Sequence, residues 1–174
     1  MKFRTILLGC AALACATGAS AQNTVKARAP VAVAPANTRL VTSVTEADLA
    51  ALIQAEGHTV DATHPFEEPS MRGKTKDGLL FVLIGTACNK NGVAGCQGIM
   101  MQIRYDSNDT VTTDNLNASN LAEAALSAWW DRSDKTVGFT RYVVLDDGVT
   151  WMNIRQNLRV LLAIAPTAQG YVFK

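Results

Sequence analysis

The chain has 174 residues, 16 of them basic and 15 acidic, so its formal net charge is +1 at neutral pH. A chain of this length can bury a hydrophobic core as one domain. A nearly neutral chain has no general attraction to nucleic acid or to anionic lipid. Nucleic acid is therefore excluded as an expected partner.

The first twenty-one residues have the pattern of an export signal. Lys2 and Arg4 give a positive start, an apolar run follows over 6–16, and the small-x-small sequence Ala19-Ser20-Ala21 predicts cleavage after it. Cleavage would remove two basic residues and no acidic one, which changes the net charge from +1 to −1. We therefore predict a signal peptide over 1–21 and a periplasmic or secreted mature protein.

Two cysteines of this segment raise the alternative of a lipid anchor, because Cys10 and Cys15 each follow a small residue. The apolar run before Cys10 is short, and Ala12 is a poor residue three positions before Cys15. The later cleavage site is therefore favoured over lipidation. No segment of about eighteen or more apolar residues follows the signal, so no transmembrane segment is predicted.

The segment 22–42 is rich in alanine, valine and spaced prolines and has neither helical nor strand periodicity. This composition predicts an extended linker. The folded domain is expected over 43–174.

The domain is predicted to open with a helix. Thr45 can cap it, and Asp48 at the third helical position gives a form of the capping box. Leu49, Leu52 and Ile53 form one apolar stripe. Gly57 is expected to end the helix, because glycine tolerates the left-handed conformation found there.

Four strands are predicted next, over 58–63, 70–75, 79–87 and 97–105. The segment 79–87 is almost continuously apolar, which is typical of a central strand covered on both faces. In its partner, alternate residues fall on opposite faces. One face holds Ile99, Met101, Ile103 and Tyr105, and the other holds Met100, Gln102 and Arg104.

Cys88 and Cys96 flank the connection between the last two of these strands. Two cysteines this close in an exported protein usually pair, and facing positions of an antiparallel pair suit a disulfide. We therefore predict a Cys88–Cys96 disulfide. A redox pair or half of a metal site are the alternatives, although seven residues lie between the cysteines and no histidine is near.

A second helix is predicted over 116–132, carrying Trp129 and Trp130 near its end. Strands over 137–145 and 150–154 should follow, joined by a hairpin at Asp146-Asp147-Gly148. The apolar spacing from Leu158 to Ala165 predicts a last helix that Pro166 stops or kinks. The order is helix, four strands, helix, two strands, helix, which predicts an α+β fold with an antiparallel sheet and N-terminal, central and C-terminal helices.

Several of these segments resemble the YbjN-domain family, bacterial proteins labelled sensory-transduction regulators. The resemblance covers about 44–173. It is carried by the opening helix 45–57, by the cysteine pair leading into 99–105, by Trp130-Asp131 at the place of the family's Asn-x-Trp-Asn sequence, and by 141–148. Ala128 and Asp131 stand where the family has asparagines.

The resemblance implies a type III secretion chaperone-like fold and a regulatory or chaperone-like role with no established reaction. It implies a protein or peptide partner, or a homodimer. Packing in the core or at its rim is the favoured role of Trp129 and Trp130. Because half-exposed tryptophans often anchor interfaces, the same two residues are the candidate partner-binding residues if the chain has such a surface.

No catalytic residue, metal site or cofactor is predicted. The sequence has no Gly-x-Ser-x-Gly motif and no glycine-rich phosphate loop, and the spacing of His58 and His64 fits no metal site. We predict a non-enzymatic binding protein. A small secreted hydrolase or metal-dependent enzyme without a recognisable motif is the alternative.

Overall fold

The structure is a computed structural model that describes residues 38–63 and 66–174. The predicted export signal 1–21, with Cys10 and Cys15, lies outside the described residues, as does 22–37 of the predicted linker. The end of that linker is described, and Leu40–Val41 forms strand β1, which pairs antiparallel with β8, Val149–Thr150.

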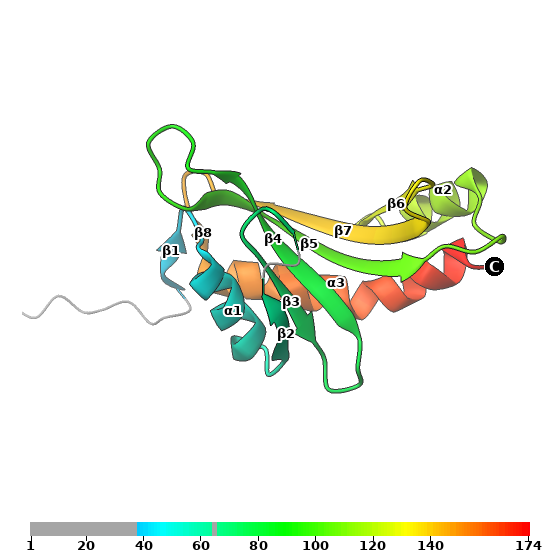
Figure 1. The fold of residues 1–174 in the computed structure, drawn as a ribbon, viewed down its shortest axis with the longest axis horizontal. Helices are drawn as coiled ribbons and strands as arrows, with labels where there is room; N and C mark the ends of the chain where they lie inside the picture. The colour runs from blue at the N-terminus through cyan, green and yellow to red at the C-terminus, as the bar shows by residue number, and fades with distance from the viewer. Residues whose placement is uncertain (1–37, 64–65) are drawn as a thin grey trace, which may run out of the picture. The chain divides into compact units, whose positions relative to one another are not determined.

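A six-stranded antiparallel sheet organises the described part of the chain (Figure 1). Its strand order is β2-β3-β4-β5-β7-β6. The strands are β2 (Thr59–Thr63), β3 (Ser70–Lys74), β4 (Leu80–Cys88), β5 (Cys96–Asp106), β6 (Ser127–Asp131) and β7 (Thr136–Val144). The four strands predicted over 58–105 are therefore confirmed, and the one expected over 79–87 forms β4, which is buried from Phe81 to Gly85.

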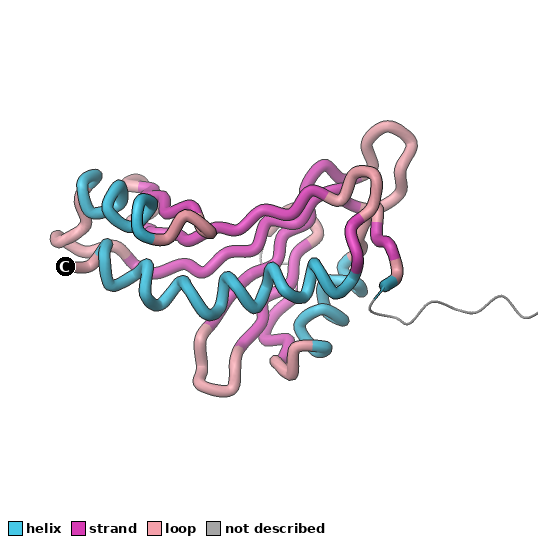
Figure 2. Tube along the Cα trace, turned by 180° about the vertical axis from the view of Figure 1, so that it is seen from behind, coloured by secondary structure: helices cyan, strands magenta, loops and turns pink. Residues whose placement is uncertain are grey.

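Within the described residues, three helices accompany the sheet: α1 (Glu46–Ala55), α2 (Thr113–Ala122) and α3 (Trp151–Val172). The predicted capping box of α1 is confirmed, because Thr45 and Asp48 bond each other's backbone N–H groups. Gly57 follows the helix with φ of 75°, as expected of the residue that ends it. Figure 2 shows α3 running along the sheet.

The hydrophobic core lies between one face of the sheet and the helices. The alternation along β5 places Ile99, Met101 and Ile103 on this face, where all three are fully buried. They join one cluster with residues of the helices, among them Leu49 of α1 and Leu158 of α3. Burying these side chains is the main source of stability in this part of the chain.

The predicted helix over 116–132 is wrong in its second half. Helix α2 ends at Ala122, and the two tryptophans lie on strand β6. The side chain of Asn120 helps to explain why this segment is a strand. Its amide oxygen accepts from the backbone N–H of Ala128 at 2.7 Å, and its amide nitrogen donates to the carbonyl oxygen of Ala128 at 3.2 Å. An amide side chain of the helix therefore bonds β6 as a neighbouring strand would.

The predicted strand over 150–154 and its hairpin are also wrong. The turn at Asp147 and Gly148 forms, but β8 pairs with β1 rather than with β7. The hydroxyl of Thr150 accepts from the backbone N–H of Asn153 at 3.2 Å, so Thr150 caps α3 instead of continuing a strand. Helix α3 also continues past Pro166, where it was expected to stop or kink, as far as Val172. The α+β class with an antiparallel sheet is confirmed.

Candidate binding surface

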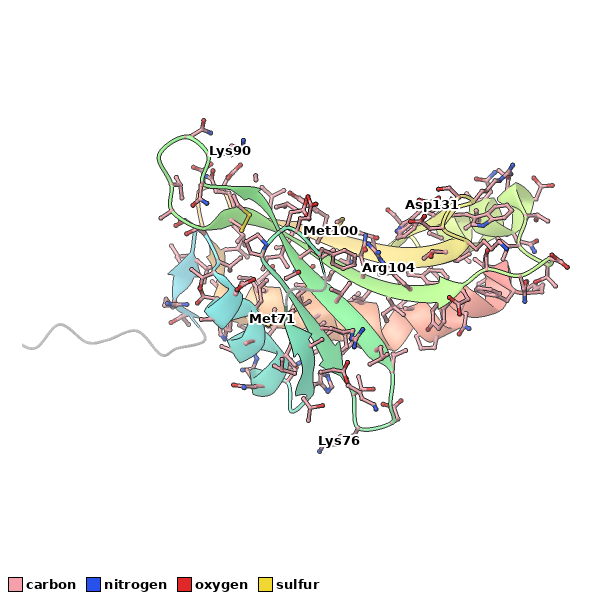
Figure 3. The ribbon with its side chains drawn as sticks, viewed as in Figure 1. Met71, Lys76, Lys90, Met100, Arg104 and Asp131 are labelled. Atoms are coloured by element: carbon pink, nitrogen blue, oxygen red, sulfur yellow. A yellow bond between two sulfur atoms is a disulfide. The ribbon has the colours of Figure 1, made fainter. Side chains whose placement is uncertain are left out.

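The second face of the sheet is not covered by any helix of the described residues. Side chains of four neighbouring strands point to this face. We call it the open face, and it consists of Leu80, Val82 and Ile84 on β4, Met100, Gln102 and Arg104 on β5, Trp129 on β6, and Thr140, Tyr142 and Val144 on β7. Figure 3 places Met100 and Arg104 on it.

Three large apolar side chains of the open face are exposed, whereas Val82 and Ile84 on the same face are buried. Leu80 is 43 % exposed, Tyr142 51 % and Val144 54 %. Each lies in a strand of the central sheet rather than in a loop. Single exposed apolar residues are ordinary, but a group of them on one sheet face marks a contact surface.

Arg104 is held by polar and aromatic contacts at the middle of the open face. Its Nε and Nη2 atoms donate to Oε1 of Gln102 at 2.9 and 2.7 Å. Its guanidinium carbon lies 4.4 Å from the ring centroid of Phe66 and 5.5 Å from that of Trp129. These are cation–π distances, which fix the orientation of the planar cation.

A partly buried hydrogen-bond network supports Arg104. Gln102 is 4 % exposed, and its Nε2 donates to the hydroxyl of Thr140 at 3.0 Å. The indole N–H of Trp129 donates to the same hydroxyl at 2.7 Å. The indole lies flat on β7, since a Cβ atom at Gly138 would be only 2.0 Å from the ring.

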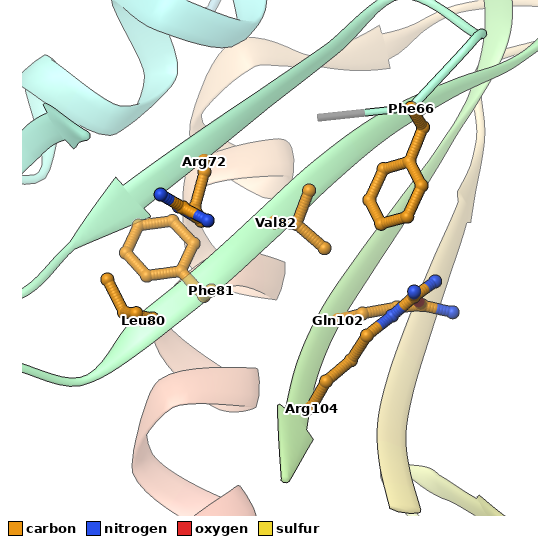
Figure 4. A pocket seen from close by; sticks show the side chains of 7 residues that line it. All are labelled: Phe66, Arg72, Leu80, Phe81, Val82, Gln102 and Arg104. Atoms are coloured by element: carbon orange, nitrogen blue, oxygen red, sulfur yellow. The ribbon is translucent and has the colours of Figure 1, made fainter. Parts of the chain in front are cut away.

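A pocket of about 290 Å³ opens beside Arg104 (Figure 4). It combines an apolar floor with two guanidinium groups, and its lining residues are Phe66, Arg72, Leu80, Phe81, Val82, Gln102 and Arg104. The Nε of Arg72 donates to Asp61 at 2.6 Å. Arg104 forms no ion pair with any carboxylate of residues 38–63 and 66–174. Burial lowers the pKa of Arg104, and the charge of Asp134 opposes that shift.

Trp129 and Trp130, the predicted partner-binding residues, do not share a surface. Successive residues of a strand point to opposite faces, so Trp129 lies on the open face and Trp130 packs against the core. The Nε1 of Trp130 is buried and has no hydrogen-bond partner among the described residues, and the guanidinium of Arg132 lies 4.5 Å from its ring centroid. Only Trp129 belongs to the candidate surface.

Sequence reasoning did not select Phe66, Arg104 or Tyr142 as site residues. One pattern pointed to Arg104, because the alternation over 97–105 placed an arginine beside Met100 and Gln102 on one face of a central strand. A charged residue at such a position needs partners or a function. Nothing local predicted Phe66, which reaches Arg104 from the connection between β2 and β3.

Cys88 and Cys96 face each other at the end of the β4–β5 pair. Their sulfur atoms lie 2.14 Å apart, the distance of a disulfide bond (Figure 3). Cys96 is 1 % exposed and belongs to the core cluster. In residues 38–63 and 66–174, no three side chains of the metal-ligating types His, Cys, Asp and Glu come together.

None of the helices in the described part of the chain is long and apolar enough to cross a membrane.

No family model and no curated protein matches the chain. A solved structure does match, the crystal structure of the ExsC–ExsE complex. The TM-score is 0.50 at 14 % identity, and the match covers 75 % of this chain and 96 % of that one. At this identity the likeness shows the fold alone. It confirms the type III secretion chaperone-like α+β fold.

Proposed function

We propose that this chain is an exported, non-enzymatic, YbjN-like protein that binds a protein or peptide partner in the periplasm through the open face. The observation that carries the proposal is the exposure of Leu80 on β4 and of Tyr142 and Val144 on β7, on a face that no helix of the described residues covers. Burying such side chains against a partner removes apolar surface from water, which favours association. The fold adds support, because a chain of similar fold was crystallised in the ExsC–ExsE complex.

Export is supported by the sequence over 1–21 and by the disulfide distance between Cys88 and Cys96, since disulfides persist outside the cytoplasm. Residues 1–25 fused to alkaline phosphatase should give an active, exported enzyme. Mass spectrometry of the purified mature protein should find Gln22 at its N-terminus. Retention in the cytoplasm would contradict export, and a lipid-modified Cys10 or Cys15 would replace the soluble form by an anchored one.

The binding surface can be tested by crosslinking in the cells that make the protein. A photoreactive phenylalanine analogue at position 142 should give an adduct, which the double variant Leu80→Ser, Val144→Ser should abolish. The matched control is the same analogue at Leu121, which is 86 % exposed but lies on α2. The adduct's mass separates a different protein from a second copy of this chain, and equal adducts at positions 142 and 121 would contradict the proposal.

A further inference from the structure

The pocket at Arg104 combines an apolar surface with positive charge. Two nearby side chains of one peptide, an apolar one and an acidic one, can bind both parts together. Leu80 and Val82 give the apolar floor, and guanidinium groups stand on either side of it. Figure 4 shows the planar group of Arg104 below the ring of Phe66, with Val82 on the sheet between Arg104 and Arg72. A purely apolar ligand would leave Arg104 without a carboxylate partner, and a simple anion would leave the floor unfilled.

The two arginines differ in their need for an anion. Arg72 already pairs with Asp61. Arg104 donates Nε and Nη2 to the neutral oxygen of Gln102 and pairs with no carboxylate of the described residues. Its Nη1 atom takes part in neither of these bonds. A cation fixed in this way is ready to receive a carboxylate in a charge-assisted hydrogen bond.

We propose that the open face binds an acidic peptide segment, with an Asp or Glu carboxylate on Arg104 and a large apolar side chain on the floor formed by Leu80 and Val82. This inference rests on the proposed function and names the partner's chemistry. Charge complementarity selects the acid, because Arg104 and Arg72 line the pocket and Asp61, the partner of Arg72, is not among its lining residues.

The register of the sheet sets the spacing within the peptide. Val82 lies opposite Gln102, two residues before Arg104 on β5. Val82 and Arg104 are therefore diagonal neighbours, which lie about 7–8 Å apart in an antiparallel pair. An extended peptide repeats its side chains on one side about every 7 Å. The expected motif is therefore an acid separated by one residue from a large apolar side chain.

The test is a selection of random peptides of about twelve residues, displayed on phage, against the purified mature protein. Selected peptides should carry an Asp or Glu two positions from Leu, Ile, Val, Met or Phe. A labelled peptide made from the strongest sequence is then titrated with protein and followed by fluorescence anisotropy. Raising the salt from about 0.05 M to about 0.5 M should weaken its binding, because screening acts on the charge pair.

The variant Arg104→Gln should weaken binding of this peptide about tenfold or more. Changing the peptide's acid to its amide should cause the same loss, and the two changes together should cost no more than either alone, since both remove one contact. Arg104→Lys keeps the charge and should lose less. The control Lys76→Gln removes a charge at the β3–β4 turn, away from Arg104 (Figure 3), and should not change binding.

Each result decides one of the two proposals. Thermal melting of Arg104→Gln checks that the variant is folded, and the amide peptide tests the same contact with unchanged protein. Selected peptides without an acid, additive losses, self-association in place of peptide binding, or a selection that yields no binder would each overturn the acidic motif. The function of the open face would still stand if the crosslink at position 142 formed and depended on Leu80 and Val144, and it would fail without that crosslink.

Discussion

Reducing the Cys88–Cys96 disulfide should lower the free energy of unfolding by about 2.5 kcal/mol. The two cysteines are separated by 8 residues in sequence. In the chain-entropy account, a loop of this length costs the unfolded chain about 8 cal/mol/K, or about 2.5 kcal/mol at 25 °C. For a domain of this size the midpoint of thermal unfolding should fall by about 10 °C.

Urea unfolding followed by tryptophan emission, with and without a phosphine reductant, measures this difference on unchanged side chains. The double variant Cys88→Ala, Cys96→Ala is the control, because its midpoint should not respond to the reductant. Labelling of the unreduced, denatured mature protein with a maleimide should find no free thiol. Coincident midpoints in the reduced and oxidised protein would refute the entropic reasoning, and two free thiols would refute the disulfide itself.

Three further substitutions test the packing, each by urea unfolding. Burial would raise the pKa of Glu56, yet the bonds from Arg159, at 2.5 Å, and from Arg155 bring it below its ordinary value of 4.5. Glu56→Gln should therefore cost about 2 kcal/mol at neutral pH. The same substitution should lessen the fall in stability below pH 4.5, where Glu56 of the unfolded chain takes up a proton before Glu56 of the folded chain does. An unchanged dependence of stability on pH below 4.5 would contradict this. Gly138→Ala should displace the indole of Trp129, shift the tryptophan emission and cost about 1–3 kcal/mol, whereas an unaltered spectrum would show that the ring does not lie there. Ala87 has a φ of 51°, which strains an alanine. Ala87→Gly should therefore raise the free energy of unfolding by about 0.5 kcal/mol, since the relief of strain exceeds the added entropy of the unfolded chain. A lower free energy of unfolding would show that the backbone is not strained there.

The sequence predicted best where periodicity and local chemistry agreed. Helix α1 has a cap, an apolar stripe and a terminal glycine within one short segment, and all three act as expected. The strands from β2 to β5 follow one another through short connections, so their pairing needs no distant information.

Prediction failed where a distant contact decides the structure. Leu126 and the two tryptophans suit a helix by apolar spacing, but Ser127–Asp131 pairs with β7 and is held by Asn120 from outside its own strand. Thr150 fits a strand by propensity, but its hydroxyl begins α3 and its backbone pairs with β1. The contact of Phe66 with Arg104 is likewise between residues far apart in the sequence, so no local pattern predicted it.

The shared hydroxyl of Thr140 has a consequence for the kinetics and the heat of association. Because Gln102 and Trp129 are already tethered to it, the recognition elements occupy their final rotamers in the free protein. Docking should therefore resemble the meeting of two rigid bodies, with little loss of side-chain freedom on this side. Differences in affinity among partners should then appear mainly in their dissociation rates.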